Sequence, residues 1–129
     1  MDTPTRNPLA TAASVEGWFY AVSGLWPVIN IRSFEWVTGP KVDRWLVKTV
    51  GLLLTAIGAV QIAAARRSDI PQELAILGVG APMALLLIDV TYVAKGRISK
   101  VYLLDALAQV GLIGLWGAGV AAGRNAEDQ

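Results

Sequence analysis

The uncharged run "TVGLLLTAIGAVQIAAA", residues 49–65, most constrains how this chain folds. It contains 17 residues without a charge and is closed by Arg66 and Arg67. A helix over residues 46–65 is long enough to cross a membrane, since about 20 helical residues span a hydrocarbon core of about 30 Å. Long basic side chains at the end of such a run extend toward the headgroups. The run therefore predicts a transmembrane helix.

Three further apolar segments flank this one, at residues 9–31, 72–94 and 101–123. The first is the least regular, because its uncharged core, which contains "GWFYAVSGLWPVI", has only 15 residues between Glu16 and Arg32. A secretory signal peptide is the alternative interpretation of this core. The acidic flank, the bulky aromatic residues and the lack of a small-residue cleavage site favour a retained helix, which Pro27 is expected to kink.

The architecture follows from the character of these runs. They show no alternation of apolar and polar residues and are rich in Leu and Ala, which favours helices. The connections "RRSDIPQE" and "KGRISK" are short, so consecutive helices are expected to be antiparallel neighbours. We therefore predict an all-α membrane protein, a four-helix transmembrane bundle with an interfacial segment between helices 1 and 2. Three spans plus a surface segment are the alternative. The bundle occupies residues 9–123, between a flexible lead (1–8) and a polar tail (124–129).

Composition agrees with a membrane location. Apolar residues make up 54% and charged residues 16% of the chain, whereas soluble domains carry about 25% charge. The net charge of +1 gives no reason to expect a nucleic-acid partner. The chain has neither Cys nor His, so thiolate nucleophiles and imidazole ligands or bases are excluded. We expect no metal and no cofactor, and these absences make an enzyme the less favoured interpretation.

The stretch "WPVINIRSFEWVTGPKVDRW" joins the first two apolar segments. It holds three tryptophans interleaved with charged residues: Trp26, Trp36 and Trp45. Tryptophan is enriched at membrane–water interfaces, where its N–H finds a polar partner. We therefore predict a short element lying along the bilayer surface and anchored by these rings. A break is expected at Gly39–Pro40, and Asp43 is expected to cap or begin the next helix, accepting backbone hydrogen bonds there.

Carboxylates within the apolar segments are the first candidates for a site. Asp89 lies inside segment 72–94, where a charge costs about 2.5–3.5 kcal/mol at the bilayer centre. Such a residue normally faces the bundle and has a partner, and Tyr92 at i+3 could donate a hydrogen bond to it. Asp105 and Gln109 form a second polar pair at i and i+4. The short turn between their segments places both carboxylates at similar depth.

Three cations of the interfacial segment are expected on the same membrane side as these two aspartates: Arg32, Arg44 and Lys48. Glu35 is an acidic residue of the same segment. The favoured interpretation is a set of structural ion pairs between these cations and the two aspartates. A proton, ion or ligand site is the alternative, and acid/base catalysis by paired carboxylates is a third. Glu16 is expected to start the first helix, where a carboxylate interacts favourably with the helix dipole. A buried coupling carboxylate is its alternative role.

Small residues recur on two of the expected helices. Gly51, Thr55, Ala59 and Ala63 repeat at i+4, and Gly119 and Gly123 form a GxxxG pair. Such residues let two membrane helices approach closely. Packing within the chain is the favoured interpretation, and a homodimer interface is the alternative.

Orientation follows from the basic residues of a four-span topology. The side with both termini carries four: Arg6, Arg66, Arg67 and Arg124. The other side carries seven: Arg32, Lys41, Arg44, Lys48, Lys95, Arg97 and Lys100. Because basic residues concentrate on the cytoplasmic side, the count of seven against four places both termini outside.

The parts "LWPVINIRSFEWVTGP" and "RWLVKTVGLLLTAIGAVQ", within residues 25–61, resemble the small bacterial four-helix membrane proteins grouped as DoxX-like. The resemblance implies four membrane helices in a bacterial cytoplasmic membrane. The group includes proteins linked to quinone or respiratory partners, and the resemblance carries over no catalytic residue.

These observations together predict a small multi-pass membrane protein. A non-enzymatic accessory or structural subunit, in a homo-oligomer or a larger membrane complex, is the favoured function. A binder or carrier of a small hydrophobic or ionic ligand, using the carboxylates and the basic segment, is the alternative. A membrane enzyme acting on lipid or quinone is the third. The expected partners are the bilayer and a lipid or quinone ligand.

Overall fold

The computed structural model describes residues 7–67 and 69–127, with side chains described as far as residue 123. Within these residues the chain forms five helices and no strand: α1 (Pro8–Ile29), α2 (Ile31–Thr38), α3 (Arg44–Ala64), α4 (Gln72–Ala94) and α5 (Tyr102–Glu127). The predicted all-α class is confirmed. Of the predicted lead, residues 1–8, the first six lie outside the described residues, and Pro8 already belongs to α1.

Local chemistry explains where the first two helices begin and end. The Asn7 side chain accepts a hydrogen bond from the backbone N–H of Leu9 at 2.9 Å, and Pro8 occupies the first helical position. Both residue types are favoured there. Asn30 separates α1 from α2 and accepts from the N–H of Ser33 at 3.1 Å. Gly39, with a φ of 99°, ends α2 in a conformation that glycine adopts without strain.

The expectation that Asp43 begins this helix is confirmed, and only a side-chain cap is lacking. Asp43 does precede α3, but its side chain makes no capping hydrogen bond. Its backbone carbonyl instead accepts from the N–H groups of Leu46 and Val47, at 3.1 and 3.2 Å. The main chain therefore provides the N-terminal cap of α3.

Three helices are long and apolar enough to cross a membrane: Arg44–Ala64, Gln72–Ala94 and Tyr102–Gly123. Large apolar side chains on them remain exposed, including Leu53 at 60%, Leu87 at 67% and Leu107 at 69%. Soluble monomers rarely expose so much contiguous apolar surface. These helices are compatible with a multi-pass membrane protein. α1 is not among them, and Glu16 lies in its middle.

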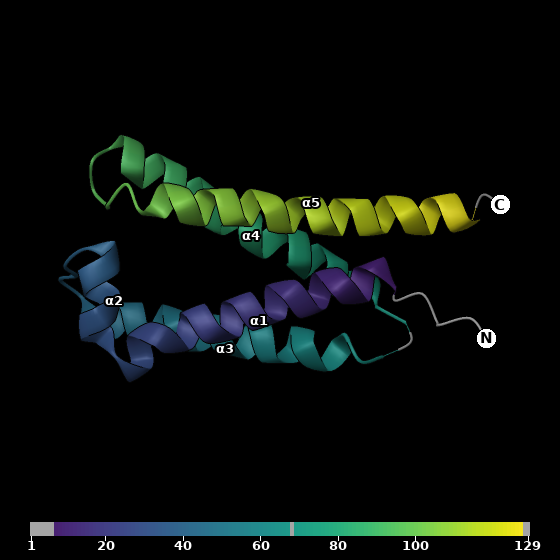
Figure 1. Cartoon of the computed structure of the whole chain (residues 1–129), viewed down its shortest axis with the longest axis horizontal. Coiled ribbons are helices and arrows are strands. Elements are labelled where there is room, and N and C mark those ends of the chain that lie inside the picture. The colour runs from purple at the N-terminus through teal and green to yellow at the C-terminus, as the bar shows by residue number, and fades with distance from the viewer. Residues whose placement is uncertain (1–6, 68, 128–129) are drawn as a thin grey trace.

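The helices associate as two pairs. α1 packs along α3, and α4 packs along α5, while α1 also contacts α5 and thus joins the pairs (Figure 1). α3 has little contact with α4 or α5 among the described residues. The start of α1 and the end of α5 lie at one end of the molecule. α2 and the connection between α4 and α5 lie at the other end (Figure 1).

The α1–α3 interface is built on glycine. A Cβ at Gly17 would lie 2.8 Å from the backbone oxygen of Gly58, and one at Gly24 would overlap the backbone oxygen of Gly51. The two backbones therefore touch, as small residues permit. Thr55 lies in the same interface and donates from Oγ1 to the Gly51 oxygen at 2.9 Å.

The predicted row of small residues only partly coincides with this interface. Gly51 and Thr55 belong to it, whereas Ala59 and Ala63 are exposed. A strict i+4 row advances about 40° around a helix at each step, because 3.6 residues complete a turn. The row therefore leaves the contact face, and Gly58 continues the interface in place of Ala59.

The glycine pair on α5 also divides. A Cβ at Gly119 would lie 2.9 Å from Cδ2 of Leu9, so this glycine accommodates the start of α1, while Gly123 has open space around it. α5 continues to Glu127, beyond its predicted end at residue 123. The sequence "RNAE" after Gly123 contains no further glycine or proline that would stop a helix.

Candidate functional site

A cavity of about 710 Å³ lies between the two helix pairs, in the half of the bundle that contains α2. All five helices contribute to its walls. The lining is mostly apolar and includes Phe19, Trp26, Phe34, Leu54, Leu85 and Ile88. A mostly apolar cavity with few polar groups, on the order of 300–1,000 Å³, is the usual form of a small-molecule site. Because α3 makes little contact with α4 or α5, α1 makes most of the contact between the two pairs.

A connected set of polar side chains forms one wall. The Tyr20 hydroxyl on α1 donates to Oε1 of Gln109 on α5 at 2.8 Å. The Gln109 amide in turn donates to both oxygens of Asp105, at 3.3 Å each. This chain of hydrogen bonds joins α1 to α5 across the cavity wall. It also satisfies Tyr20 and Gln109, which are almost fully buried.

Asp89 completes this wall from α4. It is 4% exposed, lines the cavity, and has the Asp105 carboxyl group as its neighbour. Its Oδ2 has no hydrogen-bond partner. The sequence placed Asp89 and Asp105 at similar depth, and the structure brings them together. Asp89 therefore adds a second carboxyl group, beside that of Asp105, to the wall of the cavity.

Tyr92 does not serve Asp89 in this arrangement. The tyrosine is 38% exposed, and the Lys95 ammonium lies over its ring at 5.5 Å from the centroid. Three residues advance about 300° around a helix, so Tyr92 is turned about 60° away from Asp89. That rotation carries its ring out of the bundle interior.

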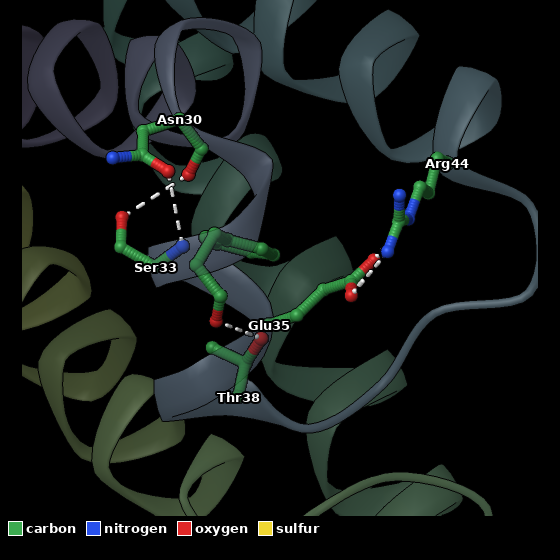
Figure 2. A network of polar contacts seen from close by, with 6 residues as sticks. Asn30, Ser33, Glu35, Thr38 and Arg44 are labelled. Atoms are coloured by element: carbon green, nitrogen blue, oxygen red, sulfur yellow. Dashed lines mark hydrogen bonds and ion pairs between the residues drawn. The ribbon is translucent and has the colours of Figure 1, made fainter.

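The cations of the interfacial segment pair within the segment instead of with the aspartates. Arg44 donates from Nε to Oε1 of Glu35 at 2.7 Å and from Nη2 to Oε2 at 3.0 Å. Figure 2 shows the guanidinium at the start of α3 facing this carboxylate on α2. It is the one ion pair within the described residues, so the predicted pairs of Arg32, Arg44 and Lys48 with the aspartates are absent. The Arg44 hydrogen bonds hold the pKa of the Glu35 carboxyl below its ordinary value.

The reason for this difference is the fold of α2. The short helix turns its carboxylate back toward the first turn of α3, nine positions along the chain. Asp89 and Asp105 belong to the other helix pair. Arg44 therefore pairs with Glu35 in its own segment, and it is not available to Asp89 or Asp105 as the sequence predicted.

The tryptophans of the segment differ in exposure. Trp26 donates from Nε1 to the Ser33 hydroxyl at 2.8 Å and meets the Phe34 ring edge-on. Trp36 is 88% and Trp45 69% exposed. Their role as interface anchors remains a prediction.

Lys41 connects this segment to α5 beside the cavity. Its ammonium lies 4.9 Å from the ring centroid of Tyr102 and 5.9 Å from that of Phe34, and both rings line the cavity. It also donates to the backbone oxygen of Thr38 at 3.2 Å. A contact between residues so far apart leaves no local signal in a sequence, and Lys41 was not predicted as a site residue.

A second buried polar group lies deeper in the bundle. Glu16, Gln61 and Trp116 come from α1, α3 and α5, and each is 0% exposed. Gln61 donates from Nε2 to Oε2 of Glu16. Oε1 of Glu16, Oε1 of Gln61 and Nε1 of Trp116 have no partner. The expectation that Glu16 starts its helix is wrong, because α1 begins at Pro8 and the carboxylate lies two turns inside it.

Within the part of the chain that the structure describes, no three acidic, His or Cys side chains gather as metal ligands would. Comparison of the chain with protein-family models, with curated proteins and with solved structures finds no match. The resemblance to DoxX-like proteins therefore remains a prediction.

Proposed function

We propose that this chain is a multi-pass membrane protein in which α1 is the fourth span. α1 has 22 residues, and a helix of that length extends about 33 Å at 1.5 Å per residue. It lies along α3 (Figure 1), and its one charged residue, Glu16, faces the bundle interior. α2 then lies along the membrane surface, at the same side as the connection between α4 and α5.

The function proposed is the binding of a small, mainly apolar molecule with a cationic end. The observation that supports it is the pair of neighbouring carboxyl groups, Asp89 and Asp105, in the wall of the mostly apolar cavity. Asp89 and Asp105 are neighbours, and neither has a cationic partner among the described residues. In a low-dielectric interior, two adjacent carboxylates need a proton or a cation between them. A cationic ligand supplies that charge while its apolar part fills the cavity.

A purely structural subunit explains the cavity less well. A structural role favours paired polar groups, because burying an acceptor without a partner costs free energy. The favoured expectation of ion pairs that fix the helix register also requires cations beside the aspartates, and Arg44 is bound to Glu35. The geometry thus favours the binder or carrier over the accessory subunit.

The test uses two probes of the same shape and opposite charge. Calorimetric titration of the purified protein in detergent is expected to show binding of tetraphenylphosphonium and none of tetraphenylborate. Asp89→Asn is expected to weaken phosphonium binding at least about tenfold, or about 1.4 kcal/mol. Its melting temperature is expected to stay unchanged or rise, because no ion pair is lost. Asp69→Asn, an exposed site, is the matched control.

Two results would contradict the proposed function. One is equal affinity of the wild-type protein for both probes, which would show partition into detergent or the cavity without use of the carboxylates. The other is an Asp89→Asn variant that melts at a lower temperature and binds the phosphonium as before, which would assign Asp89 a structural role.

A further inference from the structure

The buried group of Glu16, Gln61 and Trp116 belongs to the other half of the bundle. Gln61 lies three residues before the end of α3, near the face that holds the start of α1 and the end of α5. Trp116 lies seven residues beyond Gln109 on α5, about 10 Å along the helix. None of the three lines the cavity. A buried carboxyl group thus stands between the cavity and the opposite face of the molecule.

Tyr20 lies between the two polar groups. It follows Glu16 by four residues, or about 6 Å along α1, and its side chain lines the cavity. Both Glu16 and Asp105 are near enough to act electrostatically on its hydroxyl group. The hydroxyl itself donates to Gln109. A group that can both donate and accept a proton therefore separates the cavity carboxyls from Glu16.

The partners of Glu16 suit both of its protonation states. An ionised carboxylate accepts from Nε2 of Gln61, and its second oxygen faces the unpartnered indole N–H of Trp116. A protonated carboxyl can instead donate its O–H to Oε1 of Gln61, which has no other partner. An amide offers one donor and one acceptor, so Gln61 serves either state. The site can gain or lose a proton without separating the helices.

The elements packed around Glu16 bring it no counter-charge. α3 presents Gln61, α5 presents Trp116, and α4 presents Gly78, where a Cβ would overlap the Trp116 indole. The titratable groups that face it are Tyr20 on its own helix and, beyond Tyr20, Asp105 with its neighbour Asp89. Among the described residues no Lys or Arg pairs with Glu16. Its charge is therefore controlled by proton binding.

We propose that Glu16 is a proton-transfer site that couples cation binding in the cavity to proton movement toward the opposite face. When a cation enters, the O–H bond of the proton held between Asp89 and Asp105 breaks. The Tyr20 hydroxyl turns away from Oε1 of Gln109, which accepts from it in the structure. Its oxygen then accepts this proton as its own passes to ionised Glu16, where a new O–H bond forms. The negative charge left in the cavity is balanced by the cation. This inference rests on the proposed function and makes the protein a proton-coupled carrier.

The first measurement needs no ligand. Infrared difference spectra of the protein in lipid vesicles, between acidic and alkaline pH, report the carbonyl stretch of each protonated carboxylic acid. The wild-type spectrum is expected to contain a band that Glu16→Gln removes and Glu73→Gln retains. Glu73 is an exposed glutamate in the first turn of α4 and serves as the matched control. If Glu16→Gln removes no band from the wild-type difference spectrum, the inference is overturned.

The second measurement tests coupling. Vesicles with the protein and an internal pH indicator receive an external pulse of tetraphenylphosphonium. The wild-type protein and Glu73→Gln are expected to move protons in response. Glu16→Gln replaces the carboxyl group by an amide, which has nearly the size of a protonated glutamate but cannot release a proton. This variant is expected to bind the probe within twofold of wild type and to lose the proton movement. Proton movement retained by Glu16→Gln would overturn the inference and leave the binding function standing. A wild-type protein that fails to bind the probe would instead overturn the proposed function.

Discussion

The two faces of α1 pack in opposite ways. Toward α3 it presents Gly17 and Gly24, and the two backbones touch along the interface. Toward α5 it presents Tyr20, and the contact there runs through a tyrosine hydroxyl, an amide and a carboxylate. Close backbone contact leaves no volume for a ligand. The looser interface holds the polar chain of the cavity wall, while Gly24 and Gly51 of the tight interface only border the cavity. The tight contact therefore mainly stabilises the bundle, and the looser one leaves room for a ligand.

The spacing of residues along α1 explains why its two faces differ. Gly17 and Gly24 are seven residues apart and therefore share a face, since seven residues nearly complete two turns. Glu16 and Tyr20 are four apart and share a neighbouring face. Glu16 lies near the boundary, because it contacts α3 through Gln61 and faces α5 through Trp116. α1 therefore packs against α3 and α5 with two different sets of residues, and Glu16 contacts both neighbours.

The largest expected effect comes from filling the glycine interface. In Gly58→Val the new side chain would overlap the backbone of Gly17 and Ala21, which cannot move aside as a flexible side chain does. Overpacking of this kind costs about 1–3 kcal/mol or more. We expect a large fall in the melting temperature in detergent and loss of the monodisperse peak in size-exclusion chromatography.

The control for this variant is another glycine of the bundle. Gly114→Val on α5 places the same side chain where nothing lies within 4 Å, and it is expected to leave the melting temperature nearly unchanged. Equal destabilisation of both variants would show that helix propensity, and not the close approach of α1 and α3, determines the effect. That result would remove the structural distinction between the two interfaces.

An intermediate effect is expected from filling the cavity. Ala108 lines the cavity, and its neighbour Leu107 is 69% exposed on the outer face of α5. Ala108→Phe is expected to weaken tetraphenylphosphonium binding by about tenfold, or about 1.4 kcal/mol, because the ring occupies ligand volume. The melting temperature is expected to change little, since the cavity has room for the added atoms.

Leu107→Phe is the control, because it adds the same ring beside the cavity but outside it. Its binding isotherm is expected to match that of the wild-type protein. If Leu107→Phe weakens binding as much as Ala108→Phe, the probe binds elsewhere. The assignment of ligand binding to the cavity would then be wrong, while the role of the glycines between α1 and α3 would be unaffected.

Much of the fold could be predicted from the sequence because lipid imposes strong local rules. Long uncharged runs and their charged ends located the four long helices within a few residues, and the Gly39–Pro40 break was placed correctly. The contact face of α3 was predicted less well. An i+4 row of small residues is easily seen, but the face that meets α1 depends on helix rotation. Rotation is fixed by the partner helix.

The candidate site was predicted in part. The neighbourhood of Asp89 and Asp105 followed from a short turn, which is a local property. Gln61 and Trp116 were not predicted as site residues, because their role depends on contacts with Glu16, which is distant from both in the sequence. A Gln within an otherwise apolar run was the available signal. The pairing of Arg44 with Glu35 depended on how α2 folds back, which charge alone does not specify.

The smallest expected effect concerns the ion pair outside both interfaces. Arg44 holds the pKa of Glu35 below its ordinary value, which is about 4.3 in an unfolded chain. The stabilisation is therefore fully present above about pH 4.3 and is lost as the pH falls through the lower folded-state pKa. Glu35→Gln is expected to lower the melting temperature only slightly at neutral pH, because exposed ion pairs contribute little. The difference from wild type is expected to shrink as the pH falls below about 4.3, and added salt should shrink it as well. A large loss at neutral pH, or a difference that persists in acid, would instead show that α2 helps to hold the helix pairs together through this contact.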